Sequence, residues 1–352
     1  MRPGNKMKMK FPGLADVHVH LRVPGGEQKE DYRTGSAAAL AGGFTTLMAM
    51  PNTNPAITTA DGWRAAQKQA DHESLCDVML FMGVSMASIE TLPELGKVAP
   101  ALKLYMDLTF GDLRIDGMEN LQRIADLWPS EKVLALHAEG ESVRTGLKLA
   151  EKFRRRMHFC HISRKVEIEW IAEAKRRGLP VTCEVTPHHL FLNEADALRL
   201  GALGDMRPRL ASQNDVDALW AHINTTIDCV ASDHAPHTLA EKQASQNPPP
   251  GVPGLESTLP LLLNAAAERR ISYERITELL STNPRQIYSL PAQPDTWVEI
   301  DADESYEFPD HQLYTKCAWS PFSGTYIKGK VIRVVLKGKE LVRNGIVHDF
   351  VR

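Results

Sequence analysis

Histidines and carboxylates in this sequence stand where short apolar runs end. His18 and His20 lie two residues apart, which puts both side chains on one side of a strand, where they could chelate one ion. The pair by itself is equally typical of hydrogen-bonded core histidines. Asp233 favours a metal, because burying an unpaired carboxylate costs on the order of several kcal/mol and a cation would satisfy all these groups. The candidate ligands at the run ends are His18, His20, Lys103, His137, Cys160, His161, Glu184 and Asp233.

Lys103 is the unusual member of this set, because it interrupts the apolar run at residues 101–106. Desolvation and nearby cations would favour its neutral, nucleophilic amine. Such an amine can take up carbon dioxide and become a carbamate, an anion with two oxygens that can bridge two metal ions. The alternative, that Lys103 points outward or pairs with an acid, is left equally open by the sequence.

Eight nearly continuous apolar runs must position these side chains. They span residues 14–20, 44–50, 78–84, 101–106, 133–139, 157–163, 181–187 and 227–233. Runs that are apolar on both faces are typical of parallel strands covered on both sides. Helical patterns lie between them, for example at residues 60–72, 164–177 and 213–222.

This alternation predicts an α/β fold, a (β/α)₈ TIM barrel over residues 11–290. The active site of such a barrel lies at the C-terminal ends of its strands, where the candidate ligands stand. A doubly wound sheet is the main competitor, but no Gly-rich phosphate loop follows any of the runs.

The composition changes near residue 291. Residues 296–300, 328–336 and 340–342 alternate like strands, with Gly338 and Gly345 as turn residues. We therefore expect residues 291–352, together with residues 1–10, to form a small β appendage on the barrel.

Composition excludes several classes of protein. The 352 residues are 43% hydrophobic, and 41 Lys and Arg against 44 Asp and Glu give a net charge of −3, which argues against a nucleic-acid binder. The basic run at residues 154–156 is more typical of a solvated helix end. No apolar run is long enough for a membrane span and no signal peptide is evident. Five cysteines without framework spacing favour a reducing compartment, so we predict a cytoplasmic protein.

Seven motifs together resemble the dihydroorotases, members of the cyclic amidohydrolase superfamily, and most nearly the animal type that is part of a multifunctional pyrimidine-synthesis protein. The motifs are DVHVHLR (16–22), MPNT (50–53), LKLY (102–105), HAE (137–139), CHIS (160–163), TPHH (186–189) and SDHAPH (232–237). The resemblance runs in order from about residue 11 to the end. The sequence departs from it at Val23, where the family has an acidic residue, and in the short stretch before the first strand. That short stretch suggests a domain separated from a larger polypeptide.

The resemblance implies a binuclear zinc centre bridged by carboxylated Lys103. One zinc would be held by His18, His20 and Asp233, and the other by His137 and His161. In the animal type, Cys160 and Glu184 resemble ligands of a third zinc, shared with His18 and Asp233.

The same resemblance implies the reaction, a reversible cyclisation of N-carbamoyl-L-aspartate to L-dihydroorotate. A hydroxide bridging the metals would attack the ring carbonyl, and Asp233 would act as general acid and base. Arg22 would clamp the substrate carboxylate with Asn52 and His237. Arg207 and Pro250 resemble contacts to the polar edge of the ring, and Thr109 and Phe110 resemble a lid.

Partners and rivals follow from the family. The resemblance implies a homodimer that works with carbamoyl phosphate synthetase and aspartate transcarbamoylase, as domains or subunits. The nearest rival functions are other cyclic amidases, namely hydantoinase, dihydropyrimidinase and allantoinase. A non-catalytic scaffold relative and a metal-dependent phosphoesterase on the same barrel are the rivals from other classes.

Overall fold

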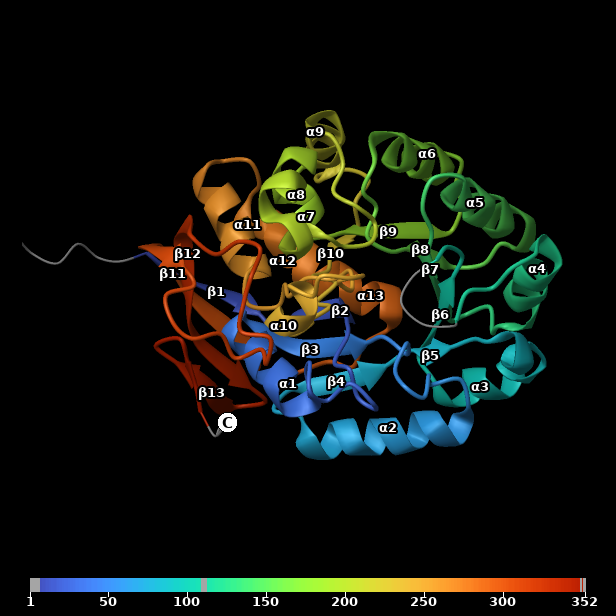
Figure 1. Cartoon of the computed structure of the whole chain (residues 1–352), viewed down its shortest axis with the longest axis horizontal. Coiled ribbons are helices and arrows are strands. Elements are labelled where there is room, and N and C mark those ends of the chain that lie inside the picture. Colours follow the sequence, from blue (N-terminus) through green and yellow to red (C-terminus); the bar gives the residue numbers. More distant parts are fainter. Residues whose placement is uncertain (1–6, 109–112, 349, 351–352) are drawn as a thin grey trace, which may run out of the picture.

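Parallel strands form the centre of the molecule in this computed structural model, which describes residues 7–108, 113–348 and 350. Within these residues eight strands surround the core, the third of them made of β4 and β5 in succession (Figure 1). They are β2 (Leu14–Val19), β3 (Phe44–Ala49), β4 (Asp77–Leu80) with β5 (Met82–Gly83), β6 (Ala101–Tyr105), β7 (Val133–His137), β8 (Met157–Phe159), β9 (Val181–Val185) and β10 (Cys229–Val230). Each overlaps one of the predicted apolar runs.

Hydrogen bonds close these strands into a barrel. One sheet runs in the order β10-β9-β8-β7-β6-β5 and another in the order β2-β3-β4. Phe81 N donates to Ala49 O at 2.9 Å where β4 passes into β5, and a parallel bridge joins Val19 to His234 beyond β10. The predicted (β/α)₈ TIM barrel is confirmed, and every residue of β2 and β3 is buried, as expected of strands covered on both faces.

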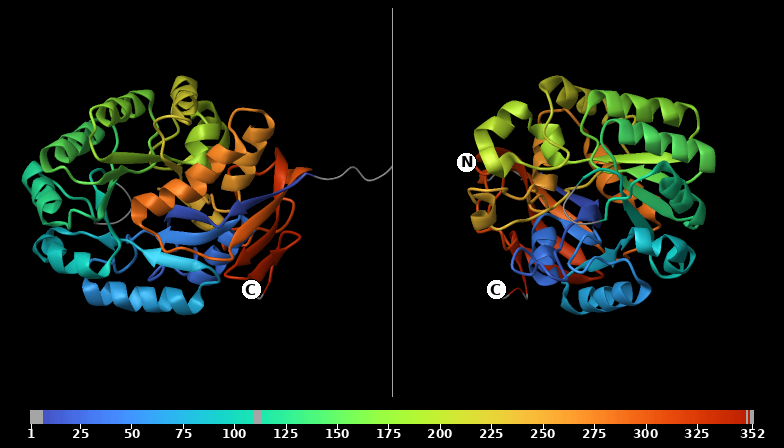
Figure 2. Two further views of the ribbon diagram at one scale, coloured as in Figure 1. Left: turned by 180° about the vertical axis from the view of Figure 1, so that it is seen from behind. Right: turned by 45° about the vertical axis from the view of Figure 1, so that its right-hand side comes forward.

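Helices surround the barrel and return the chain from each strand to the next (Figure 2). The main ones are α1 (Tyr32–Ala41), α2 (Ala60–Glu73), α3 (Leu92–Val98), α4 (Met118–Leu127), α5 (Glu141–Phe153), α6 (Lys165–Arg176), α9 (Gln213–His222) and α11 (Thr258–Ala267). Shorter ones are α7 (Pro187–Phe191), α8 (Glu194–Leu200), α10 (Leu239–Lys242), α12 (Tyr273–Thr277) and α13 (Asn283–Tyr288), with 3₁₀ turns η1 (Met86–Thr91) and η2 (Gly201–Gly204) and a π turn η3 (Glu278–Thr282).

Local signals explain where these helices begin and end. The Ser212 side chain caps α9 by accepting a hydrogen bond from Asp215 N, and α6 ends just before Gly178, whose φ of 72° is costly for residues with a Cβ. The three predicted helices at 60–72, 164–177 and 213–222 are confirmed within one residue at each end.

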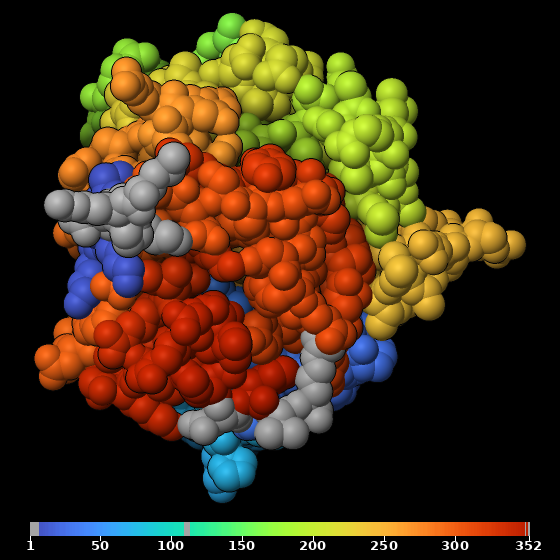
Figure 3. All heavy atoms as spheres, turned by 90° about the vertical axis from the view of Figure 1, so that its left-hand side faces the viewer, coloured from blue at the N-terminus to red at the C-terminus, as the bar shows by residue number. Residues whose placement is uncertain are grey.

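The appendage is an antiparallel sheet in the order β1-β11-β12-β13-β14. Its strands are β1 (Lys8–Pro12), β11 (Trp297–Phe308), β12 (Thr325–Leu336), β13 (Lys339–Arg343) and β14 (Ile346–Val347). The C-terminal part of the chain, orange-red to red, forms a large part of one face of the molecule (Figure 3). The start of the chain supplies the edge strand β1, and the tail supplies the rest. Gly338 and Gly345 have φ values of 80° and 77°, so they occupy the predicted turns. The division of the chain into residues 11–290 and 291–352 stays a prediction.

The basic run at residues 154–156 supports neighbouring backbone. Arg154, Arg155 and Arg156 donate to the carbonyl oxygens of Gly178 at 3.1 Å, Ala125 at 2.6 Å and Glu131 at 2.7 Å. These contacts explain the run without a nucleic acid. Among the helices that the structure describes, none combines the length and the apolar character needed to cross a bilayer.

Candidate metal centre and substrate pocket

The mouth of the barrel gathers the predicted ligands. His18 lies in β2, Lys103 in β6, His137 in β7 and Glu184 in β9. His20, Cys160 and His161 come within two residues of the ends of their strands, and Asp233 comes three residues after β10. Seven of these eight side chains are buried, and only His20 is partly exposed. The parallel topology produces this convergence, because all strands end on the same rim.

Asp233 lies between two histidines from β2. Its Oδ1 atom is 3.3 Å from His18 Nε2 and 3.1 Å from His20 Nε2, and His20 Nδ1 is 2.8 Å from Asn52 Oδ1. Burial alone would raise the pKa of Asp233, but His18 and His20 outweigh it and hold the pKa well below its usual range. Burial lowers the pKa of His20 to about 4. The site therefore pairs an ionised carboxylate with a neutral imidazole, the forms that bind metal.

His161 connects this group to His137. Its ring centroid lies 5.2 Å from that of His18 and 4.4 Å from that of His137. His161 Nδ1 is buried and has no hydrogen-bond partner among the described residues, and burial together with His137 keeps the pKa of His161 well below its usual value. His18, His161 and Asp233 each offer one ligand atom within 4.8 Å of the others. A buried ring nitrogen that has no hydrogen-bond partner, next to such a group of ligand atoms, is consistent with coordination of a metal ion.

Lys103 points into the barrel and not outward. It is fully buried, and its Nζ atom donates to Cys160 Sγ at 2.9 Å. Among the described residues no carboxylate pairs with it, and its positive charge contributes to the lowered pKa values of His137 and His161. The geometry therefore excludes the outward and the acid-paired alternatives for this lysine.

A second group of potential ligands lies deeper in the barrel. His18 Nδ1 is 2.5 Å from Glu184 Oε1, and His18, Cys160 and Glu184 also offer ligand atoms within 4.8 Å of one another. Burial opposes ionisation of Glu184, but His18 and His158 lower its pKa below its usual range. Burial raises the pKa of the Cys160 thiol, so without a cation this sulfur stays protonated at neutral pH.

Arg22 and His237 form a second wall of the site, apart from the one that holds Asp233 and the histidines. Arg22 Nε donates to Pro236 O at 3.1 Å, and its Nη2 atom is 3.1 Å from His237 Nε2, which in turn lies 3.1 Å from Pro250 O. Burial and the charges of Arg22 and Lys29 lower the pKa of His237 to about 2, so its imidazole is neutral. Arg22 thus takes its local support from these groups, where the family has an acidic residue and this chain has Val23.

A pocket of about 480 Å³, open to solvent, joins the two walls. Its lining brings together His18, His20, Arg22, Asn52, Tyr105, His137, His161, Arg207, Asp233, Ala235, Pro250 and Gly251. Arg207 is held over it by Asp205 at 2.5 Å. Lys103, Cys160 and Glu184 lie behind the lining, and Thr109 and Phe110 lie outside the described residues. The charged and hydrogen-bonding side chains of this lining suit a small polar molecule.

Three residues of the site were missed by the sequence analysis. Tyr105 lines the pocket, with a buried hydroxyl that has no partner among the described residues. His158 Nε2 lies 3.0 Å from Glu184 Oε2, and His188 has a buried Nε2 without a partner in the described part of the chain. The signal for Tyr105 and His158 was their position two residues from Lys103 and Cys160, on the same side of a strand.

Comparisons with known proteins agree with this geometry. A dihydro-orotase-like family model matches residues 7–148. The multifunctional protein CAD of Squalus acanthias is 46% identical over 340 residues, covering 96% of this chain but 15% of the relative. A dihydroorotase of Methanosphaera stadtmanae is 30% identical over 390 residues, covering 98% of this chain and 88% of the relative.

Solved structures share the fold. An L-hydantoinase (dihydropyrimidinase) from Arthrobacter aurescens has a TM-score of 0.90 at 24% identity, covering 98% of this chain and 87% of that one. The inactive dihydroorotase-like domain of a Chaetomium thermophilum CAD-like multifunctional protein has a TM-score of 0.82 at 24% identity, covering 98% and 97%.

The barrel belongs to the fold class of the solved hydantoinases, and groups of side chains that could hold metal lie at its mouth. Within that class, this chain belongs to the dihydroorotase family. It spans 15% of the length of the two multifunctional relatives, the Squalus protein and the multifunctional protein pyr1-3 of Dictyostelium discoideum, which is 43% identical to it.

Proposed function

We propose that this chain is a dihydroorotase, which interconverts N-carbamoyl-L-aspartate and L-dihydroorotate in pyrimidine biosynthesis. The observation that carries the proposal is one pocket with histidines and Asp233 on one wall and Arg22 with His237 on the other. The first wall suits hydrolysis of an amide, and the second suits a substrate with a free carboxylate.

The donor set fits two zinc ions. His18, His20 and Asp233 would hold one and His137 and His161 the other, with Lys103 between them as a carbamate. The carbamate forms when the neutral Lys103 amine adds to carbon dioxide, making an N–C bond and releasing a proton to water. A third zinc would take Cys160 and Glu184 with His18 and Asp233. When bound, the metals supply Lewis acidity, which polarises the ring carbonyl and lowers the pKa of water.

Asp233 then moves the proton. Its carboxylate, held ionised by His18 and His20, accepts a proton from the attacking water and passes it to the departing ring nitrogen. In the biosynthetic direction Asp233 takes the proton from the ureido nitrogen as the ring closes and passes it to the departing carboxylate oxygen, which leaves as water after taking one further proton from solvent. The reaction balances in both directions, because ring opening consumes one water and releases one proton, and ring closure takes up one proton and releases one water.

Arg22 binds and orients the substrate. Its guanidinium, fixed by Pro236 O, presents planar donors that match a carboxylate. Asn52 and His237 would complete the clamp, and Arg207 with the backbone at Pro250 would contact the polar edge of the ring. Thr109 and Phe110 are proposed as a lid that excludes water.

The test is a substrate comparison on purified, zinc-loaded protein. We expect turnover of dihydroorotate and of carbamoyl aspartate, and little or none of hydantoin, dihydrouracil or allantoin. Turnover of the neutral rings alone would make the chain another cyclic amidase. A protein without stoichiometric metal and without turnover would be a scaffold relative, like the domain described as inactive in Chaetomium.

We also propose the setting of the reaction. Since its multifunctional relatives are several times longer, this chain would cooperate with carbamoyl phosphate synthetase and aspartate transcarbamoylase, as domains or subunits, and form a homodimer. All five cysteines are buried and free, which is consistent with the reducing cytoplasm.

A further inference from the structure

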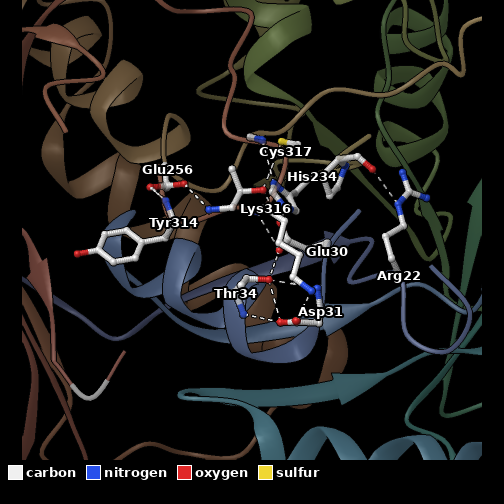
Figure 4. A network of polar contacts seen from close by, with 12 residues as sticks. Arg22, Glu30, Asp31, Thr34, His234, Glu256, Tyr314, Lys316 and Cys317 are labelled. Atoms are coloured by element: carbon white, nitrogen blue, oxygen red, sulfur yellow. Dashed lines mark hydrogen bonds and ion pairs between the residues drawn. The ribbon is translucent and has the colours of Figure 1, made fainter. Parts of the chain in front are cut away.

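Glu30 is a fully buried carboxylate just outside the pocket (Figure 4). Glu30 lies in the loop after β2. Its side chain links this loop to two other segments: His234, which follows Asp233, and residues 315–316, which precede the appendage strand β12. Its Oε2 atom accepts from His234 Nε2 at 3.2 Å and from the Thr315 hydroxyl. Its Oε1 atom accepts from Lys316 N at 3.3 Å and from the Thr34 hydroxyl. All four contacts are donations to one carboxylate.

His234 connects Glu30 to the candidate metal centre, through its ring on one side and its backbone on the other. Its Nδ1 atom accepts from Gly254 N at 3.2 Å, so its remaining proton lies on Nε2 and faces Glu30. The carbonyl of His234 accepts from His20 N at 2.7 Å. The backbone of His234 also forms parallel bridges with Val19 and Val252. His234 therefore fixes both neighbours of the centre, Asp233 along the chain and His20 across the barrel.

The backbone at Asp233 needs such support. Its φ of 44° lies in the left-handed region, which non-glycine residues adopt only where the surrounding structure holds them. A small rotation there would swing the carboxylate away from His18 and His20.

We propose that Glu30 is a positioning residue, which locks the His234 imidazole and thereby holds the Asp233 carboxylate in place for metal binding and proton transfer. The kinetic part of this inference rests on the proposed reaction, and the metal-binding part rests on the proposed zinc centre.

Glutamine cannot replace Glu30 without conflict. If the amide oxygen faces His234, the NH₂ group faces the Lys316 N–H, and two donors meet. If the NH₂ group faces His234, the imidazole must move its proton to Nδ1, which then meets the Gly254 N–H. Either orientation leaves buried donors opposed.

The experiment compares Glu30→Gln with two controls that disturb the same docking contacts. Glu256 is a second buried carboxylate, which accepts from Tyr314 N at 3.0 Å and Thr315 N at 3.2 Å. Among the described residues it has no hydrogen bond to a residue that lines the pocket. Glu256→Gln therefore weakens the docking of the segment before β12 without touching His234. Thr315→Val removes the hydroxyl donor to Glu30 and leaves the His234 contact.

We expect Glu30→Gln to lower kcat for dihydroorotate about 10- to 100-fold with KM changed less than threefold, the size usual for supports of metal ligands. Zinc retention against a chromophoric chelator should fall about tenfold. Both controls should stay within twofold of the unsubstituted protein in both measurements.

Other results would overturn the inference. Unchanged kcat and unchanged zinc retention in Glu30→Gln would overturn it. Losses of equal size in the two controls would also overturn it, because they would show that the effect comes from weaker docking of the segment before β12. If Glu30→Gln does not fold, Glu30→Asp, which is one methylene too short to reach both His234 and Lys316, should give a smaller loss of both quantities, and full retention would again overturn it. Failure of the proposed function is distinguishable, because the unsubstituted protein would then bind zinc but not turn over dihydroorotate.

Discussion

The two walls of the pocket are built in different ways. The wall with the histidines and Asp233, proposed to bind metal, is called the metal-binding wall below. Of its candidate ligands, His18, Lys103 and His137 lie within strands, so the barrel itself fixes their backbone. On the clamp wall, Arg22 and His237 lie on loops that depend on remote contacts. Trp319, from the segment before β12, donates its Nε1–H to His237 O at 2.8 Å. The comparison teaches that strands of the barrel fix part of one wall directly, whereas the position of the other wall depends on loops and on the segment before β12.

The walls also differ in charge. Asp233 and Glu184 give the metal-binding wall buried carboxylates that a cation would neutralise. On the clamp wall Arg22 lies beside a neutral His237, and among the described residues no carboxylate forms an ion pair with its guanidinium, which can therefore bind an anion. Substitutions on one wall should therefore affect different quantities from those on the other.

The strongest test of the metal-binding wall is Lys103→Ala. We expect zinc and activity to be lost together, with kcat reduced at least about 10³-fold, because the bridging group is removed. Short-chain carboxylic acids should restore part of the activity by replacing the carbamate. Metal analysis and steady-state assays check this, and full activity without added acid would remove the bridging role.

The clamp wall is tested by Arg22→Met. Loss of a charge-assisted contact of about 2–3 kcal/mol should raise KM for dihydroorotate roughly 30- to 150-fold while zinc content stays unchanged. Titration with dihydroorotate and a zinc assay on the same samples measure both quantities. An unchanged KM would contradict the clamp, and a loss of zinc would mean that the two walls are not independent.

Cys160→Ser separates the deeper ligand group from the binuclear one. We expect it to lose the zinc that His18, Cys160 and Glu184 would share, with kcat reduced less than about tenfold, because Asp233 and His161 are left in place. Metal stoichiometry before and after substitution is the measurement. The same zinc content in both proteins would argue against a third metal.

The smallest effect concerns Lys242, which supports the clamp wall by donating to Asp205 O at 3.0 Å, Pro249 O at 3.0 Å and Gly251 O at 3.1 Å. Burial lowers its pKa to about 8. Between about pH 8 and 10 the unfolded chain then binds more protons than the folded one, so this lysine makes stability rise with pH.

Relative to Lys242→Met, the unsubstituted protein should therefore gain on the order of 1 kcal/mol in free energy of unfolding across that window. Urea unfolding of both proteins at several pH values measures the difference. A parallel pH dependence of the two proteins would show that Lys242 keeps its ordinary pKa.

Much of this molecule could be predicted from its sequence, because the relevant signals are local. The apolar runs marked the barrel strands, and the helical patterns marked three of the helices, since capping and periodicity act over a few residues. Residues 8–10 of the edge strand β1 were grouped with the appendage only by their position. Lys8–Pro12 alternates polar and apolar side chains, but its partner β11 is remote in the chain, so the pairing could not be predicted. The length of β11 was underestimated for the same reason, since its irregular register is set by β12.

What the sequence determined by itself is the kind of side chain at the end of each strand, and hence that histidines and carboxylates would meet at one rim. Only the tertiary structure decided that Lys103 faces inward, that His158 contacts Glu184, and that Glu30 reaches His234 across 204 residues of chain. The physical reason is that residue types and hydrophobic periodicity can be read from residues close together in the sequence. Burial and side-chain pairing arise only when segments that are distant in the sequence pack against one another and exclude water.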